Sequence, residues 1–117
     1  MAADTLIIYH NPGCSKSTET LQILQQNNKA PEVIEYLKNP PDKIQLRRII
    51  EMLGIPAQEL IRTTEHAYID TKLGESATEE QIIEAISAQP ILLQRPIVIS
   101  NNRAIIGRPP TKVLEII

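Results

Sequence analysis

The sequence predicts a small α/β domain with a mixed four-stranded sheet and a helical insertion in the middle of the chain. An apolar run at residues 6–9 and an alternating run at residues 32–37 lie on either side of a helical pattern. This order is typical of a right-handed βαβ unit with parallel strands. Near the carboxyl end, strand patterns at residues 96–100 and 104–107 flank Asn101-Asn102, which favours a hairpin.

The first helix is expected to follow the first strand after a sharp loop at residues 10–13, which contains proline and glycine. Its pattern begins at Ser15. Helical spacing predicts Leu21 and Leu24 on one face and the polar residues Thr20, Gln22 and Gln25 on the other.

The middle of the chain contains further helical patterns. Asp42 is a plausible N-cap for a helix that continues to about residue 53, and Gly54 ends it. Pro56 opens a short helix to about residue 61. The polar segment 62–76 is expected to be irregular.

The last helices complete the predicted topology. The sequence predicts a capping box from Thr78 to Gln81 for a helix to about Ser87, and a terminal helix that starts at Pro109-Pro110. The resulting order, βα-β, helices, then ββα, matches a thioredoxin-like topology with a helical insertion. The 117 residues suit one domain, residues 1–117.

Composition and charge exclude several functional classes. The chain has 42% hydrophobic residues but no Trp or Phe, so its core is aliphatic. A net charge of −2 gives no general attraction to nucleic acid. No signal peptide or membrane-length apolar stretch is evident, so a cytoplasmic protein is expected. One cysteine and two histidines make neither a disulfide nor a metal site, and no glycine-rich nucleotide loop is present.

The single cysteine, Cys14, is the strongest candidate for catalysis. It lies between a strand and a helix start, where unsatisfied N–H groups and the helix dipole favour the thiolate. Most free cysteines are small buried core residues, and that is the alternative here. The surrounding loop favours the reactive thiol.

Five residues indicate an anion site near this cysteine. Three arginines lie at the edges of predicted elements, and arginine binds tetrahedral oxyanions through two hydrogen bonds at once. In α/β sheets such ligands gather beyond the strand ends. Lys16 and Ser15 add a cation and a hydroxyl in the first helical turn; the alternatives are a solvated lysine and an ordinary capping serine. The arginines are Arg62, Arg95 and Arg108.

His10 lies four positions before Cys14, at the end of the first strand. It could lower the pKa of the thiol as a cation or hydrogen-bond donor. It could equally be a solvated or backbone-bonded loop histidine, and the sequence does not choose between the two.

Five segments in order along the chain resemble the glutaredoxin-dependent arsenate reductases of the thioredoxin-like superfamily. As a set they are specific, and they extend over nearly the whole chain. The segments are YHNPGC (9–14), YLKNPP (36–41), LIR (60–62), PILLQRPIV (90–98) and GRP (107–109).

The resemblance implies a site, a reaction and partners. Cys14 corresponds to the cysteine that attacks arsenate, Arg62, Arg95 and Arg108 to the oxyanion-binding arginines, and His10 to a histidine that lowers the pKa of the cysteine. A cis peptide bond is implied between Arg95 and Pro96. Arsenate would form a thiol–arsenate adduct, and glutathione and glutaredoxin would supply the electrons with no bound cofactor. The implied role is arsenic detoxification.

Two other functions fit parts of the same sequence. The Cys14-x-x-Ser17 spacing is similar to that of one-cysteine thiol–disulfide oxidoreductases, which could process glutathione mixed disulfides. The Spx-type regulators, which bind RNA polymerase, share the fold and several segments. Their usual redox switch is a cysteine pair, whereas this chain has one cysteine.

Overall fold

A computed structural model describes residues 6–74 and 76–117. Its internal contacts divide the chain into two compact units. The first unit combines the chain up to Asn39 with Arg95–Ile117, and the second is Pro40–Gln94. The expectation of one domain over residues 1–117 stays a prediction.

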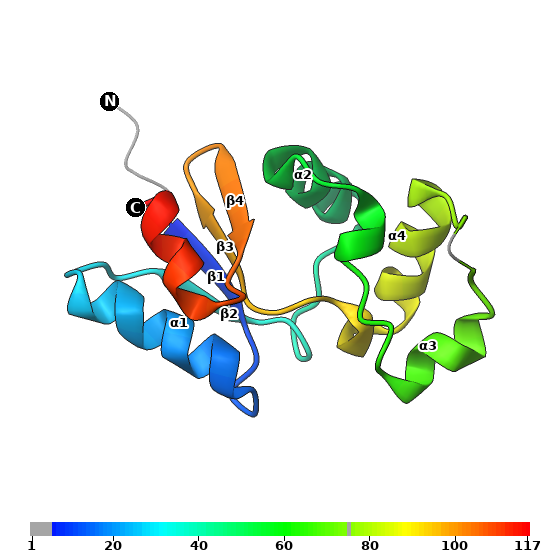
Figure 1. The fold of residues 1–117 in the computed structure, drawn as a ribbon, viewed down its shortest axis with the longest axis horizontal. Coiled ribbons are helices and arrows are strands. Elements are labelled where there is room, and N and C mark those ends of the chain that lie inside the picture. The colour runs from blue at the N-terminus through cyan, green and yellow to red at the C-terminus, as the bar shows by residue number, and fades with distance from the viewer. Residues whose placement is uncertain (1–5, 75) are drawn as a thin grey trace. The chain divides into compact units, whose positions relative to one another are not determined.

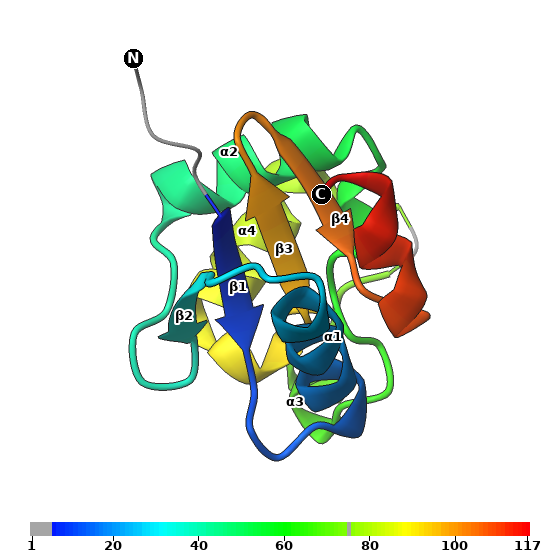
Figure 2. The same ribbon diagram turned by 90° about the vertical axis from the view of Figure 1, so that its left-hand side faces the viewer.

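The first unit contains a four-stranded sheet in the order β2-β1-β3-β4 (Figures 1 and 2). β1 pairs parallel with β2 and antiparallel with β3, which pairs antiparallel with β4. The sequence prediction of a mixed sheet with a parallel βαβ unit and a hairpin is therefore confirmed. The strands are β1 Leu6–His10, β2 Glu32–Glu35, β3 Ile97–Ser100 and β4 Arg103–Ile106.

Helix α1 (Ser15–Gln26) lies against this sheet, with the 3₁₀ helix η3 (Pro110–Glu115) beside it (Figure 2). The core between them is aliphatic, as the composition predicts. Each strand except β2 contributes at least one side chain, and α1 and η3 add one each. These residues are Ile8, Leu24, Val98, Ile105 and Val113.

Thr20 does not lie on an exposed face of α1, so that prediction is wrong. The side chain is fully buried, and its hydroxyl donates a 2.8 Å hydrogen bond to the carbonyl of Lys16. This bond within the helix satisfies the hydroxyl, which lets the threonine be buried at little cost. Its neighbour across the packing interface is Gly107, where a Cβ atom would lie 2.7 Å from Thr20 Oγ1.

The second unit is helical, with α2 (Lys43–Leu53) packed against α4 (Glu79–Ala88) (Figure 1). The predicted N-cap at Asp42 and the predicted capping box from Thr78 to Gln81 are present, and Asp42 also forms a capping box with Gln45. Gly54 ends α2 in the left-handed conformation, with φ of 66°. The 3₁₀ helices of this unit are η1 (Ala57–Glu59) and η2 (Pro90–Leu92).

Helix α3 (His66–Thr71) is a difference from the sequence prediction, which left residues 62–76 irregular. The helix has six residues, and none of them is buried. It therefore has no apolar stripe that a periodicity argument could detect. Residue 75 lies outside the described part. None of the helices in the described residues is both long and apolar enough to cross a membrane.

Candidate active site

Cys14 is the N-cap residue of α1 and is 9% exposed. The loop before it is held by the Asn11 side chain, whose Oδ1 accepts a 2.9 Å hydrogen bond from the Gly13 N–H. The Cys14 N–H donates to the Asn11 carbonyl at 3.0 Å, and the Thr18 N–H donates to the Cys14 carbonyl at 3.0 Å. The loop therefore fixes the sulfur at the first turn of the helix.

The environment lowers the pKa of the Cys14 thiol below its ordinary value. Burial is the largest single influence and raises the pKa, because it disfavours the charged form. The backbone N–H of Ser17, the Arg95 side chain and the backbone N–H of Lys16 together outweigh it. Although the sulfur makes no capping hydrogen bond of ordinary geometry, these N–H groups stabilise its anion.

Arg95 and Arg108 are brought together by the β3–β4 hairpin. Arg95 precedes β3, Arg108 follows β4, and Ile97 pairs with Ile106 at that end of the hairpin. Arg108 Nε donates to the Arg95 carbonyl at 2.7 Å, and Arg108 Nη2 lies 3.7 Å from Cys14 Sγ. The implied cis peptide bond between Arg95 and Pro96 is present, and Arg108–Pro109 is also cis.

His10 contacts Ser17 in the structure. The His10 Nδ1 to Ser17 Oγ distance is 2.6 Å, and Ser17 Oγ also accepts a 3.0 Å hydrogen bond from the Asn11 N–H. Burial lowers the pKa of His10, and the charge of Glu35 opposes this only in part. The imidazole is therefore mostly neutral near pH 7. It contacts the hydroxyl of Ser17, and the backbone N–H of the same residue acts on the Cys14 sulfur.

Two further predicted residues lie at the start of α1. The side chains of Lys16 and Ser15 are exposed. Lys16 acts on Cys14 through its backbone N–H.

Arg62 belongs to the second unit, where its charge is paired. Its Nε donates to Glu65 Oε1 and its Nη1 to Gln94 Oε1, both at 3.2 Å. Its backbone N–H donates to the Leu92 carbonyl at 2.7 Å. A role for Arg62 at Cys14 stays a prediction.

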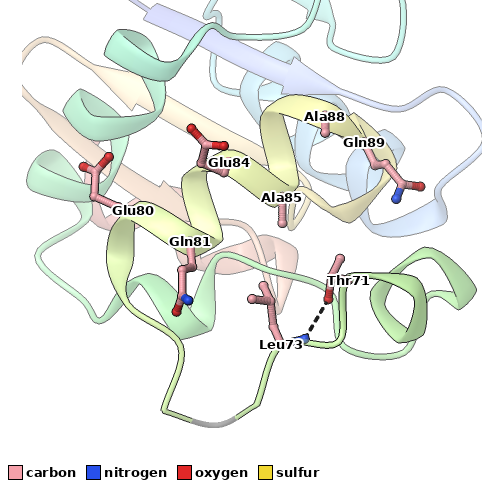
Figure 3. Close-up of a pocket in the computed structure, with 8 residues that line it drawn as sticks. All are labelled: Thr71, Leu73, Glu80, Gln81, Glu84, Ala85, Ala88 and Gln89. Atoms are coloured by element: carbon pink, nitrogen blue, oxygen red, sulfur yellow. Dashed lines mark hydrogen bonds between the residues drawn. The ribbon is translucent and has the colours of Figure 1, made fainter.

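One hollow in the second unit has a volume of about 540 Å³ and lies along α4 and the end of α3 (Figure 3). Its lining contains no cysteine, histidine or arginine. Glu80 and Glu84, which border it, form ion pairs with Arg47 and Lys43. The hollow therefore offers no nucleophile or anion site. Within the described residues, no cluster of three or more His, Cys, Asp or Glu could hold a metal ion.

Comparison with known proteins identifies the family. The chain matches the ArsC family over residues 9–116. The chain belongs to the ArsC family. It is 48% identical over 112 residues to YfgD of Escherichia coli K12, described as an uncharacterized protein, with 94% of each chain covered. It is 39% identical to an arsenate reductase of Haemophilus influenzae, over 97% of this chain and 99% of that one.

A solved ArsC-type structure confirms the fold. An arsenate reductase from Vibrio cholerae is 39% identical, with a TM-score of 0.93 over 99% of this chain and 100% of that chain. The fold of this ArsC-family chain is therefore thioredoxin-like, as its order of elements predicts.

Two side chains near Cys14 were not among the predicted site residues. Ser17 is fully buried between His10 and the loop backbone, and Tyr36 is fully buried with its hydroxyl near Arg95 and Asn11. The spacing of Ser17 from Cys14 was the available signal for the serine. The position of Tyr36 directly after a strand that is parallel to β1 was the signal for the tyrosine.

Proposed function

We propose that the chain is an arsenate reductase that uses Cys14 as its nucleophile, with glutathione and glutaredoxin as electron donors in the cytoplasm. One observation carries the proposal: a thiol of lowered pKa lies 3.7 Å from the Arg108 guanidinium, at the start of a helix. A nucleophile beside cations and N–H donors suits attack on a tetrahedral oxyanion. The named arsenate reductases of the same family support arsenate as that anion.

The first step is attack of the Cys14 thiolate on the arsenic atom. An S–As bond forms, and one oxygen takes up protons and leaves as water, which gives a thiol–arsenate adduct. Arg95 and Arg108 would hold the remaining oxygens and balance their charge, an effect of several kcal/mol when the donors are preorganised. The N–H groups of Ser17 and Lys16 point to the same location.

Reduction of As(V) to As(III) needs two electrons, which one protein thiol cannot supply through an internal disulfide. A glutathione thiol would react with the adduct, and a glutaredoxin thiol would then take the glutathione sulfur. Each donor thiol gives one electron and the two sulfurs end as a mixed disulfide. Water then hydrolyses the bond between Cys14 and As(III): the hydroxyl goes to arsenic, which leaves as arsenite, and the proton returns Cys14 to the free thiol.

A coupled assay tests this function. Purified protein, arsenate, glutathione, glutaredoxin, glutathione reductase and NADPH are combined, and NADPH loss is followed beside the Cys14→Ser variant. We expect arsenate-dependent NADPH loss that disappears in the variant and when glutaredoxin is omitted. Equal turnover by Cys14→Ser would refute the assignment of the nucleophile. Equal turnover without glutaredoxin would refute the proposed donor.

The role of Arg62 can be tested separately from the thiol. Arg62→Ala should raise the KM for arsenate, because the family resemblance assigns an oxyanion contact to this position. The pKa of Cys14, measured by alkylation against pH, should not change, because Arg62 is paired with Glu65 in the second unit. An unchanged KM would show that Arg62 does not contact the oxyanion.

A one-cysteine thiol–disulfide oxidoreductase is the main competing function. In the structure the Ser17 hydroxyl bonds to His10 and the Asn11 N–H, and only the Ser17 backbone acts on the sulfur. Turnover of a glutathione mixed disulfide without any turnover of arsenate would favour this alternative. Recovery of RNA polymerase with the purified protein, again without arsenate turnover, would favour an Spx-like regulator.

A further inference from the structure

Tyr36 holds a buried hydroxyl that the proposed chemistry does not use. The side chain is 0% exposed, and its hydroxyl forms no hydrogen bond of ordinary geometry with any of the described residues. An unsatisfied buried hydroxyl costs folding free energy, so most buried tyrosines bond theirs. The residues around this hydroxyl explain why it is retained.

The sheet register places Tyr36 at the same edge as the proposed site. His10 pairs with Glu35 across β1 and β2, and Tyr9 pairs with Ile97 across β1 and β3. One position beyond the first pair are Asn11 and Tyr36, and two positions beyond the second pair are Asn11 and Arg95, so the three residues lie in one row. These three residues follow or precede neighbouring strands at one end of the sheet.

Electrostatic interactions agree with this placement. Burial raises the pKa of Tyr36, and the charge of Arg95 and the side chain of Asn11 oppose that effect, while the Cys14 charge adds to it. The phenol is thus close to the guanidinium that acts on Cys14 and to the asparagine that shapes the Cys14 loop. At neutral pH the phenol is uncharged.

An uncharged oxygen suits a guanidinium that has to bind an anion. A carboxylate next to an arginine orients it but cancels its charge, as Glu65 does for Arg62 in the second unit. A phenol oxygen can orient a guanidinium while leaving the charge in place.

We propose that Tyr36 is a positioning residue whose hydroxyl orients the Arg95 guanidinium toward the Cys14 thiolate. It acts through Arg95 and does not itself attack or protonate a substrate. The effect on the thiol is independent of the substrate, whereas the effect on arsenate rests on the proposed function.

The variant Tyr36→Phe removes only the oxygen. We expect the apparent pKa of Cys14, from iodoacetamide alkylation rates against pH, to rise by at least about half a unit. Below that pKa, alkylation would be about threefold slower. The unfolding midpoint should change little, because the fold loses no hydrogen bond of ordinary geometry.

Tyr68→Phe is the matched control. The Tyr68 hydroxyl donates to the Leu73 carbonyl at 3.3 Å in the second unit. Its removal should leave the pKa of Cys14 unchanged. An equal shift in both tyrosine variants would overturn the proposal.

A double-mutant cycle tests whether the effect passes through Arg95. In an Arg95→Ala background, Tyr36→Phe should cause no further shift in the pKa of Cys14. The positioning role would be overturned if Tyr36→Phe shifted the pKa of Cys14 fully in the Arg95→Ala background. It would also be overturned if Tyr36→Phe caused no shift with Arg95 intact. If Tyr36→Phe shifts the pKa of Cys14 but the protein does not turn over arsenate, the inference about Tyr36 holds and the arsenate reductase proposal fails.

Discussion

The N-terminus of α1 differs from those of α2 and α4 in how the unpaired backbone N–H groups of the first helical turn are satisfied. Asp42 and Thr78 cap α2 and α4 by accepting the backbone N–H three residues on, at 2.8 and 3.2 Å. At α1 the cap position is Cys14, which makes no side-chain capping hydrogen bond. The first turn of α1 has no acidic residue and carries Lys16, whereas α4 has two glutamates there.

This difference indicates that the start of α1 lacks the stabilisation of a side-chain cap because its N–H groups serve the reactivity of Cys14. The N–H groups that a serine or aspartate would satisfy at the start of α1 instead face the Cys14 sulfur and lower its pKa. A capping rule that α2 and α4 obey and α1 breaks, at the one cysteine of the chain, is the kind of local conflict expected at a functional site. Helix α1 is instead held by packing of its buried face against the sheet.

The largest effect should follow removal of a cation that lies beside the sulfur. Arg108→Ala deletes the guanidinium that lies 3.7 Å from Cys14 and also bonds the Arg95 carbonyl. We expect kcat/KM for arsenate to fall by about a hundredfold or more, the usual loss on removing one preorganised donor. The coupled assay measures this loss.

Arg103→Ala is the matched control, since Arg103 is an exposed arginine of the same unit. It should keep the parent activity. Equal activity of the Arg108 and Arg103 variants would mean that nearness to the sulfur has no catalytic value.

The packing of α1 against the hairpin should be the next most sensitive point. A Cβ atom at Gly107 would lie 2.7 Å from Thr20 Oγ1 and 2.8 Å from Pro96 Cγ. Gly107→Ala should therefore lower the free energy of unfolding by about 1–3 kcal/mol. Thermal or urea unfolding measures the change.

Gly74→Ala is the control for the glycine substitution. A Cβ atom there would meet nothing within 4 Å, and Gly74 has no left-handed φ. We expect it to be neutral or slightly stabilising, because alanine restricts the unfolded chain. Equal destabilisation at both glycines would show that close packing is not the cause.

Exchanging the caps tests the comparison directly. Thr78→Ala should cost about 1 kcal/mol of folding free energy, because the Gln81 N–H loses its acceptor. Cys14→Ser should have the opposite sign, a gain of up to about 1 kcal/mol, because serine is a preferred cap.

The stabilities of Cys14→Ser and the parent protein have to be compared at a pH below the pKa of Cys14. Because the folded pKa lies below the unfolded one, the thiolate stabilises the folded state at high pH. That contribution is lost as the pH falls through the folded value. Unfolding of both proteins at acidic pH isolates the cap, and a less stable Cys14→Ser there would contradict the idea of a sacrificed cap.

Local signals made much of this predictable from the sequence. The caps at Asp42 and Thr78, the Gly54 helix end and the order of elements along the chain all follow from nearby residues, and all are confirmed. Cys14 and the two hairpin arginines also meet, because the predicted hairpin carries the arginines to one end.

The features that were missed depend on contacts between distant residues. Thr20 is buried because its hydroxyl is satisfied within the helix and Gly107 leaves room for it. The hydroxyl of Tyr36 becomes notable only when its lack of a hydrogen bond is visible. No periodicity or spacing rule reports on either property.

The smallest predicted effect concerns the buried His10–Ser17 pair at the start of α1. Burial holds the pKa of His10 below 6.5, its value in the unfolded chain. Between the folded pKa and 6.5 the unfolded state binds more protons, so stability should fall as the pH drops through this interval. His10→Gln should flatten that slope, whereas replacement of the exposed His66 by Gln should retain it. Urea unfolding from pH 5 to 7 measures both, and a slope that survives in His10→Gln would assign the acid sensitivity to other groups. The effect is small because it is confined to a narrow interval of pH.

The same titration can also be compared with the reactivity of Cys14. If the rate of Cys14 alkylation changes over the same interval of pH, the protonation of His10 affects the thiol, and Ser17 is the residue that connects the two.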